Sequence, residues 1–277
     1  MNVEEMLQRL DVRPSKRRGQ NFLVDEAIAR RLVSFSGVSA GEPVVEIGPG
    51  LGLLTGALLA TQANLVVVEI EEKFCEHLAA RFPSLAPERI ICADARTLTG
   101  AELADRLGAD RFTLVSNVPY SISSEVVLWT IEHRARIRRA ALLLQEEFAE
   151  RIAAAPGSRR YGSITVQRTL WAEADLGPKV SGGSFHPKAN VGSRAILLHL
   201  RPEPLVPVDD LALFESVVRA AFNQRRKTLL NALSAGIPHL DRSSWSELLQ
   251  AAGINPQRRA ETLSVEEFAR IAASIPE

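Results

Sequence analysis

The stretch 112–120, Phe-Thr-Leu-Val-Ser-Asn-Val-Pro-Tyr, has the clearest chemical pattern in the sequence. Its apolar first half is typical of a buried strand, and Ser-Asn-Val-Pro-Tyr then interrupts it. Pro119 donates no backbone hydrogen bond and biases Val118 away from the helical region, so we expect a stiff, extended loop. The Asn117 amide oxygen and a free carbonyl can together accept both hydrogens of an exocyclic base amine, while the Tyr120 ring stacks on the base. These residues suit the handling of adenine or cytosine.

A second candidate site is the stretch 44–52, Val-Val-Glu-Ile-Gly-Pro-Gly-Leu-Gly, which predicts a strand, a glycine-rich turn and a helix start. Glycines permit positive φ and a close approach of the backbone to a ligand. The dinucleotide fingerprint is G-x-G-x-x-G, and here the third glycine, Gly52, comes one residue early. Glu69 ends the next apolar run about 20 residues later, where an acid would hold two ribose hydroxyls. Both features fit either NAD or S-adenosylmethionine.

Two further features favour a methyl donor. Asp94 follows the apolar run 89–93 and could accept a hydrogen bond from the adenine amine of the donor. An Asn-x-Pro-aromatic loop then follows the next run and suits an amine acceptor. A hydride-transfer enzyme would need a proton-shuttling residue, and only His186, in a predicted loop, is a candidate. The other histidines fall on predicted helices or strands or beyond a linker: His77, His133, His199 and His239.

The composition is that of a soluble globular chain, with 277 residues, 46% hydrophobic and 24% charged. This length predicts one large domain and a small one. No apolar run approaches the ~20 residues needed to cross a bilayer, and the charged N-terminus has no signal core, so we expect a cytoplasmic protein without a membrane partner. Cys75 and Cys92 lack metal-ligand or disulfide spacing and are predicted to be buried small hydrophobes.

The basic residues are clustered although Lys plus Arg and Asp plus Glu number 33 each. Any single cluster could be a solvated helix end, but five in one chain favour a surface that binds a polyanion. The clusters are Arg13, Lys16, Arg17 and Arg18; Arg134, Arg136, Arg138 and Arg139; Arg159 and Arg160; Arg225, Arg226 and Lys227; and Arg258 and Arg259.

Predicted strands and helices alternate from residue 25 to residue 200, which indicates a parallel, doubly wound sheet. The predicted strands are Pro43–Ile47, Asn64–Ile70, Arg89–Cys92, Arg111–Val115, Arg139–Leu144 and Arg194–Leu200. The predicted helices are Asp25–Ser36, Leu51–Ala60, Glu71–Arg81, Ala101–Leu107, Ser123–His133, Glu146–Ala155 and Gly162–Glu173. Residues 1–18 are expected to be a mobile basic arm.

A proline-rich joint at 201–210 separates this region from a purely helical pattern. Apolar residues there recur at helical spacing from Phe214 to Phe222 and again from Leu229 to Leu233. We therefore expect an N-terminal arm at 1–18, a ligand-binding α/β domain at 19–202 and a small helical domain at 203–277.

Taken together, these motifs resemble those of the rRNA adenine dimethyltransferases of the small-subunit, kasugamycin-resistance (KsgA) type. The resemblance implies an α/β fold, with a Rossmann-like S-adenosylmethionine methyltransferase sheet and a small all-α C-terminal domain. It also implies dimethylation of the exocyclic amines of two adjacent adenosines near the 3′ end of 16S rRNA. The matching motifs are Gly-Gln-Asn-Phe-Leu23, Glu-Ile-Gly-Pro-Gly-Leu-Gly52, Val-Glu-Ile70, Asp94, Asn-Val-Pro-Tyr120, Tyr161-Gly162, Phe185-x-Pro187 and Ala221-Phe-Asn-Gln-Arg-Arg-Lys-Thr228, with Gly253-Ile-Asn-Pro and Arg259-Ala-Glu.

The resemblance also implies roles for individual residues. Donor contacts are expected at Asn21, Leu23, Gly48, Gly50, Glu69, Asp94 and Asn117. The amine acceptor is expected to meet Asn117, Pro119, Tyr120 and Phe185, the two rings sandwiching the flipped base. RNA contacts are expected at Arg17, Arg18, Arg225, Arg226 and Lys227. Such a transfer needs no metal and no covalent nucleophile, and we expect a monomer acting on a small ribosomal subunit precursor.

The sequence departs from the family pattern in two places. Val118 stands where the family usually has Leu or Ile. The loop 185–193 reads Phe-His-Pro-Lys-Ala-Asn-Val-Gly-Ser, whereas the family has F-x-P-x-P-K-V-D-S. The second proline, the lysine and the aspartate are replaced, so we expect a looser loop and one lost RNA contact.

Three alternatives remain open at this point. The chain could modify an adenine of large-subunit rRNA, as a related group of enzymes does. It could act chiefly as a ribosome-assembly checkpoint, in which binding matters more than chemistry. An NAD oxidoreductase is the most distant alternative.

Overall fold

The computed structural model describes residues 3–15 and 19–276. The chain forms two compact units, Met1–Ala149 with Ala174–Arg201 and Glu150–Glu173 with Pro202–Glu277. The second unit thus takes in Glu150–Glu173, which our expected boundary at residue 202 assigned to the first domain. Within the described residues, none of the helices is long and apolar enough to cross a bilayer.

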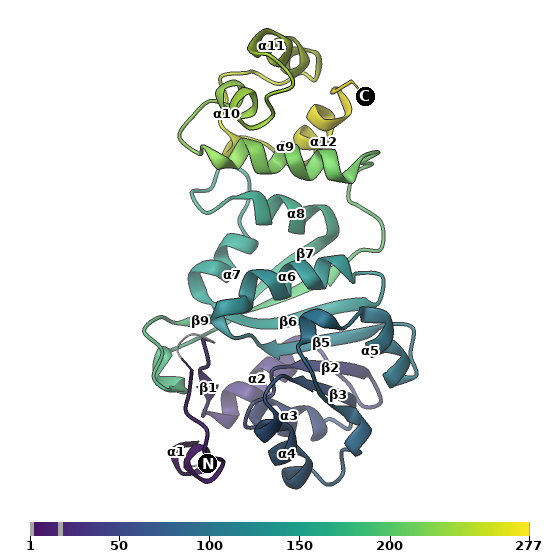
Figure 1. Cartoon of the computed structure of the whole chain (residues 1–277), viewed down its shortest axis with the longest axis vertical. Coiled ribbons are helices and arrows are strands. Elements are labelled where there is room, and N and C mark those ends of the chain that lie inside the picture. The colour runs from purple at the N-terminus through teal and green to yellow at the C-terminus, as the bar shows by residue number, and fades with distance from the viewer. Residues whose placement is uncertain (1–2, 16–18, 277) are drawn as a thin grey trace. The chain divides into compact units, whose positions relative to one another are not determined.

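The first unit is built on a seven-stranded sheet with the order β4-β3-β2-β5-β6-β9-β7 (Figure 1). Strands β2 to β6 pair in parallel, and β9 runs antiparallel to β6. The strands are β2 Pro43–Ile47, β3 Asn64–Glu69, β4 Ile90–Cys92, β5 Phe112–Asn117, β6 Ile137–Gln145, β7 Ala172–Val180 and β9 Ser193–Leu200. This arrangement confirms the predicted α/β fold, but the prediction of a parallel sheet is wrong for β9. The central strands are apolar and buried because helices cover both faces of the sheet.

The chain order reverses at β2, which lies between β3 and β5. At such a switch point the loops that follow the neighbouring strands turn to opposite sides, leaving a crevice at the carboxyl ends of the strands. Those ends are Ile47, Glu69 and Asn117. The sheet therefore brings together the sites that the sequence separated by about 70 residues.

The helices of the first unit follow the predicted pattern closely. The first long one begins after Asp25, whose side chain accepts a hydrogen bond from Ala27 N (2.8 Å), and it ends at Gly37 with φ 67°. The helices are α2 Glu26–Ser36, α3 Leu53–Leu59, α4 Glu72–Arg81, α5 Gly100–Leu107 and α6 Ser123–Glu132, with α7 Glu146–Ile152 at the boundary between the units.

The expectation of a mobile N-terminal arm is wrong for Val3–Arg9, which forms helix α1. Val3 and Leu7 lie one helical turn apart and are buried with Phe22, Leu51 and Phe74. This apolar pair was overlooked because charged residues surround it. Arg17 and Arg18, and with them the basic end of the expected arm, lie outside the described residues.

Three strands were not predicted. The predicted helix Gly162–Glu173 is too long at its C-terminal end, because α8 ends at Trp171 and β7 follows it. β7 lies at an edge of the sheet and contains Gly177 and Pro178, which weaken a strand pattern. The other two strands, β1 Phe22–Leu23 and β8 Phe185–His186, are too short to predict and pair only with each other.

The second unit is all-helical apart from the start of β7, as expected. Asp210 caps α9, and Ser264 and Glu267 form a capping box at α12. Its core includes the fully buried rings of Phe214, Trp245 and Phe268. The helices are α8 Ser163–Trp171, α9 Leu211–Asn223, α10 Leu229–Gly236, α11 Arg242–Ala251 and α12 Val265–Ala273.

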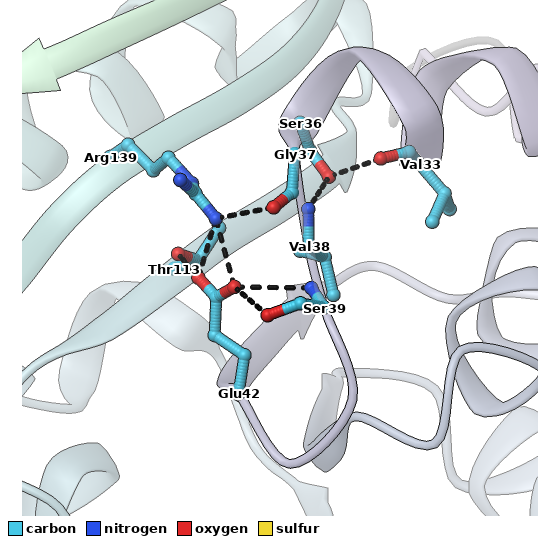
Figure 2. Close-up of polar contacts among 8 residues, drawn as sticks. All are labelled: Val33, Ser36, Gly37, Val38, Ser39, Glu42, Thr113 and Arg139. Atoms are coloured by element: carbon cyan, nitrogen blue, oxygen red, sulfur yellow. Dashed lines mark hydrogen bonds and ion pairs between the residues drawn. The ribbon is translucent and has the colours of Figure 1, made fainter.

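A polar cluster stabilises the amino end of the sheet in the first unit (Figure 2). The Glu42 carboxylate accepts hydrogen bonds from Thr113 Oγ1 (2.6 Å) and Arg139 Nη2 (2.7 Å), and from the backbone N–H of Ser39 (3.2 Å). The same Arg139 nitrogen donates to the carbonyl oxygen of Gly37 at 2.8 Å. The cluster thus joins β2, β5 and β6 to the end of α2.

Candidate donor and base site

A cavity of about 370 Å³ lies at the carboxyl ends of the parallel strands in the first unit. Five segments make up most of its lining, and each contains a residue singled out in the sequence. The lining includes Gly19–Leu23, Glu46–Leu51, Val68–Ile70, Ala93–Arg96 and Asn117–Ile122. Among the described residues, no group of three His, Cys, Asp or Glu side chains could hold a metal ion.

The glycine-rich turn faces the Asn-Val-Pro-Tyr loop directly. Gly48 has φ 67°, and a Cβ atom there would lie 3.7 Å from Pro119 Cδ. Gly50, also predicted as a donor contact, lines the cavity with φ 54°. Gly52 has a different reason to be glycine, since a Cβ would come within 2.6 Å of the Phe82 ring. The third glycine therefore permits close packing beneath the turn.

Glu69 connects the end of β3 to this turn. Its carboxylate accepts hydrogen bonds from the backbone N–H groups of Gly50 (3.0 Å), Ile70 (2.9 Å) and Glu71 (3.0 Å). Burial raises the pKa of Glu69, although these N–H groups favour the ionised form. A carboxylate offers about four acceptor positions, so it can take one more hydrogen bond from a ligand. The structure places Glu69 at the cavity, where the sequence predicted it.

Asp94 also lines the cavity, just before the short 3₁₀ helix Ala95–Thr97. It accepts a hydrogen bond from Arg96 N (3.0 Å) and forms an ion pair with Arg96 Nη2 (2.6 Å). The hydrogen bond from the Arg96 side chain lowers the pKa of Asp94, so the group is ionised at neutral pH. Ile70, whose side chain is 53% exposed, provides an apolar surface in the same lining.

The Asn117 amide has a defined orientation. Its Nδ2 atom donates a hydrogen bond to the carbonyl oxygen of Asn21 at 3.2 Å, and Asn21 Nδ2 in turn donates to the carbonyl oxygen of Gly19 at 3.1 Å. The amide nitrogen is therefore engaged, and Oδ1 is the atom of Asn117 that can accept from a ligand. Asn21 and Leu23 both line the cavity, and their contact with a donor stays a prediction.

The two carbonyl groups of the 118–119 segment are not equivalent. The Pro119 carbonyl accepts hydrogen bonds from Ile122 N (3.1 Å) and Ser123 Oγ (3.3 Å). The Val118 carbonyl is therefore the better candidate to accept from a base amine, a choice that the sequence left open. The Val118 side chain is buried, so Val for Leu or Ile is a change within the apolar core.

The expected two-ring sandwich is not present in this structure. Tyr120 lines the cavity, and its hydroxyl lies 2.7 Å from Ser193 Oγ. Phe185, in contrast, is only 3% exposed, packs in the apolar core with Leu23 and is not part of the lining. β8 is paired with β1, with Phe185 opposite Leu23, and this pairing turns the ring into the core. Phe185 therefore supports the segment that lines the cavity.

Glu46 is a cavity residue that the sequence analysis missed. It is 1% exposed, lines the cavity and accepts a hydrogen bond from Thr55 Oγ1 at 2.7 Å. Burial raises its pKa to about 8, and the nearby Glu69 acts in the same direction. An acid within the otherwise apolar strand Val-Val-Glu-Ile was the available signal, because such a residue is seldom buried without a reason.

The predicted RNA contacts in the second unit differ in their surroundings. Arg225 Nη2 donates hydrogen bonds to the carbonyl oxygens of Arg159 and Tyr161, both at 2.9 Å. Arg225 therefore holds a loop together. Arg226 and Lys227 are exposed. The sequence could not distinguish these three adjacent basic residues.

Comparisons with known proteins agree with this geometry. The sequence model of the family Ribosomal RNA adenine dimethylase matches residues 13–277 of this chain. The Ribosomal RNA small subunit methyltransferase A of Magnetococcus marinus is 38% identical over 270 residues, which cover 98% of this chain and 95% of that protein. The protein of the same name from Myxococcus xanthus is 38% identical over 267 residues, covering 96% and 93%.

Solved structures show the same fold. A dimethyladenosine transferase from Plasmodium falciparum superimposes with a TM-score of 0.74 at 22% identity, over 90% of this chain and 95% of that one. The 23S rRNA methyltransferase ErmE gives a TM-score of 0.67 at 25% identity, over 92% and 99%. The match extends nearly from end to end, and the chain belongs to the ribosomal RNA adenine dimethylase family.

Proposed function

We propose that this protein transfers methyl groups from S-adenosylmethionine to the exocyclic amines of two adjacent adenosines near the 3′ end of 16S rRNA. The main support for this proposal is one feature of the cavity. The oriented Asn117 amide and the Tyr120 ring lie in the same cavity as the glycine turn, across which Gly48 and Pro119 approach each other. The small-subunit names of the relatives support 16S over 23S rRNA as the substrate.

The residues of the cavity fit the proposed methyl donor. A volume of about 370 Å³ is within the usual range for a small-molecule site of ~300–1,000 Å³. Glu69 would accept from a ribose hydroxyl, Asp94 would accept from the adenine amine, and Ile70 would cover the face of the adenine. The turn at Gly48 and Gly50 would lie against the methionine part, and Asn21 and Leu23 would close the remaining side. When bound, S-adenosylmethionine supplies an electrophilic methyl group.

The chain's own residues would prepare the acceptor. An adenine amine is a poor nucleophile because its lone pair is delocalised into the ring. By accepting its two hydrogens, Asn117 Oδ1 and the Val118 carbonyl would concentrate electron density on the nitrogen and fix its direction. Stacking on Tyr120 would add ~1–3 kcal/mol, and orientation alone can contribute up to ~7–11 kcal/mol. The nitrogen would lose its proton to solvent after transfer.

The target base must leave its stack before it can enter the cavity. We assign part of the RNA affinity to Arg226 and Lys227, which are free of the structural hydrogen bonds made by Arg225. R226A should lower the slope of log K against log salt by about 1, while R225A should mainly lower thermal stability. Filter binding of 16S rRNA over a range of salt concentrations measures both. Equal salt slopes for R226A and the wild type would show that Arg226 does not contact the RNA backbone.

The direct test is mass spectrometry of rRNA after incubation with the protein and S-adenosylmethionine. Small ribosomal subunits that lack the modification are one substrate, and naked 23S rRNA is the competing one. We expect dimethyladenosine at two adjacent positions of 16S rRNA and none in 23S rRNA. The reverse distribution would show a large-subunit enzyme. Donor binding without methylation of either RNA would contradict the proposed function.

A further inference from the structure

Tyr120 is held at both ends. Its backbone begins the 3₁₀ turn Tyr120–Ile122, while its hydroxyl lies 2.7 Å from Ser193 Oγ. Ser193 is fully buried and is not part of the cavity lining, so the Tyr120 hydroxyl is bonded to a group outside that lining. A buried hydroxyl with a partner of the same kind is a directional contact, whose loss leaves the other hydroxyl without a partner.

Ser193 is fixed by the sheet. It is the first residue of β9 and pairs with Gln145 at the end of β6, strands that run side by side in Figure 1. The preceding carbonyl, that of Gly192, accepts a hydrogen bond from Glu146 N at 2.9 Å. The loop 185–193 differs from its family pattern at several positions, yet its last residue is held by the sheet.

A ring attached at two points has a fixed plane. With the backbone and the hydroxyl both held, Tyr120 cannot turn about its Cα–Cβ bond without breaking the contact to Ser193. The plane of the ring determines the plane of a stacked base, and with it the direction in which the amine lone pair points. In-line attack on a methyl group is sensitive to that direction, since a misplacement of ~1 Å can reduce a rate by ~10²-fold.

We propose that Ser193 is a positioning residue for the methyl acceptor, acting through the Tyr120 ring. The inference rests on the proposed function and extends it. Its largest consequence falls on the second transfer to each adenosine. The amine then already bears a methyl group and has fewer orientations in which its lone pair can face the donor. An ordered ring plane therefore favours completion to the dimethylated product.

The test compares S193A, Y120F and the double variant in single-turnover reactions with small ribosomal subunits. We expect S193A and Y120F each to slow the second transfer by about tenfold and the first by about threefold, so that monomethyladenosine accumulates. Affinity for S-adenosylmethionine should stay within about twofold, because neither hydroxyl is among the proposed donor contacts. The double variant should be no slower than the slower single variant, since both changes remove one interaction.

A matched control is S36A. Ser36 is also fully buried, and its hydroxyl donates to the Val33 carbonyl at 2.6 Å, but it lies at the end of α2 near the Glu42 cluster (Figure 2). S36A should lose stability and keep the ratio of mono- to dimethyladenosine. The product ratio therefore separates positioning from a general loss of packing.

Two results would overturn the inference. One is a wild-type product ratio in S193A, or in Y120F should S193A fail to fold. The other is a further slowing of the second transfer when S193A is added to Y120F, which would show that Ser193 does not act through the Tyr120 hydroxyl. Failure of the proposed function would look different, because the wild type itself would then leave 16S rRNA unmodified.

Discussion

Two glutamates at opposite ends of β2 have opposite surroundings. Burial alone would raise the pKa of Glu42, but hydrogen bonds from Thr113 and Ser39 and the charge of Arg139 lower it instead (Figure 2). Glu46, four residues later, is fully buried and accepts a hydrogen bond from the Thr55 hydroxyl, and burial raises its pKa to about 8. The amino end of the sheet compensates its charge, whereas the carboxyl end leaves an acid uncompensated beside a cavity. The first arrangement favours stability, and the second keeps polar groups available to a ligand.

The largest expected effect is on activity at the carboxyl end. N117A should reduce methylation by ~10²-fold or more, the scale seen when a polar transition-state contact is removed. Donor affinity should fall much less, because the Glu69 and Asp94 contacts remain. Single-turnover methylation and donor titration measure the two quantities, and near-normal turnover would dismiss the role assigned to Asn117.

The matching change at the amino end should affect stability alone. R139A leaves the Glu42 carboxylate without its cation and the Gly37 carbonyl without its donor. Removing one partner of a buried ion pair costs ~3–5 kcal/mol, and we expect about 2 kcal/mol because the Arg139 side chain is 22% exposed. Urea unfolding measures the loss. A turnover number below half that of the wild type, in protein shown to be folded, would contradict the claim that the cluster at the amino end of the sheet affects stability alone.

E46Q should change how stability depends on pH. The raised pKa means that folded Glu46 stays protonated between 4.5 and about 8, whereas the unfolded chain releases the proton there. The wild type therefore loses stability as pH rises through this window, and E46Q does not. The stability of E46Q relative to the wild type should increase by up to ~1.4 kcal/mol per pH unit. Urea unfolding at several pH values tests this, and a constant difference would show that Glu46 is ionised when folded.

E42Q should have the smallest effect and the opposite pH dependence. The lowered pKa of Glu42 means that its stabilising contribution is present above the ordinary value of 4.5 and is lost as pH falls through the folded value. E42Q should therefore be less stable than the wild type by about 1 kcal/mol at neutral pH, with the difference shrinking in acid. Thermal unfolding from neutral to acid pH records it. A difference that grows in acid would contradict the assigned ion pair.

The shared position of the carboxyl-end residues could be predicted because each follows an apolar run. Glu69, Asp94 and Asn117 lie at strand ends, and in a parallel sheet those ends share one edge whatever the details of the loops. The resemblance named Phe185, but the pairing of β8 with β1, which turns its ring away from the cavity, depends on two residues and leaves no pattern. Glu46 was missed although an acid within an apolar strand is a signal in the sequence, and the burial that raises its pKa follows from the folded chain.

The amino-end cluster could not be predicted either. Thr113 lies 71 positions after Glu42 in the sequence, and Arg139 lies 97 positions after it. No local spacing connects the three residues. Helix α1 and strand β7 were missed for a different reason. Their apolar pattern is weak, and packing against the rest of the unit decides their conformation.

The glycine at position 52 shows what a one-residue shift in a motif can mean. In a dinucleotide fold the last glycine permits close packing of the helix against the strand. Here the residue is small because the ring of Phe82 occupies the space where a side chain would be. Phe82, at the C-terminal end of α4, thus helps to shape the turn beside the cavity although it is not part of the cavity lining.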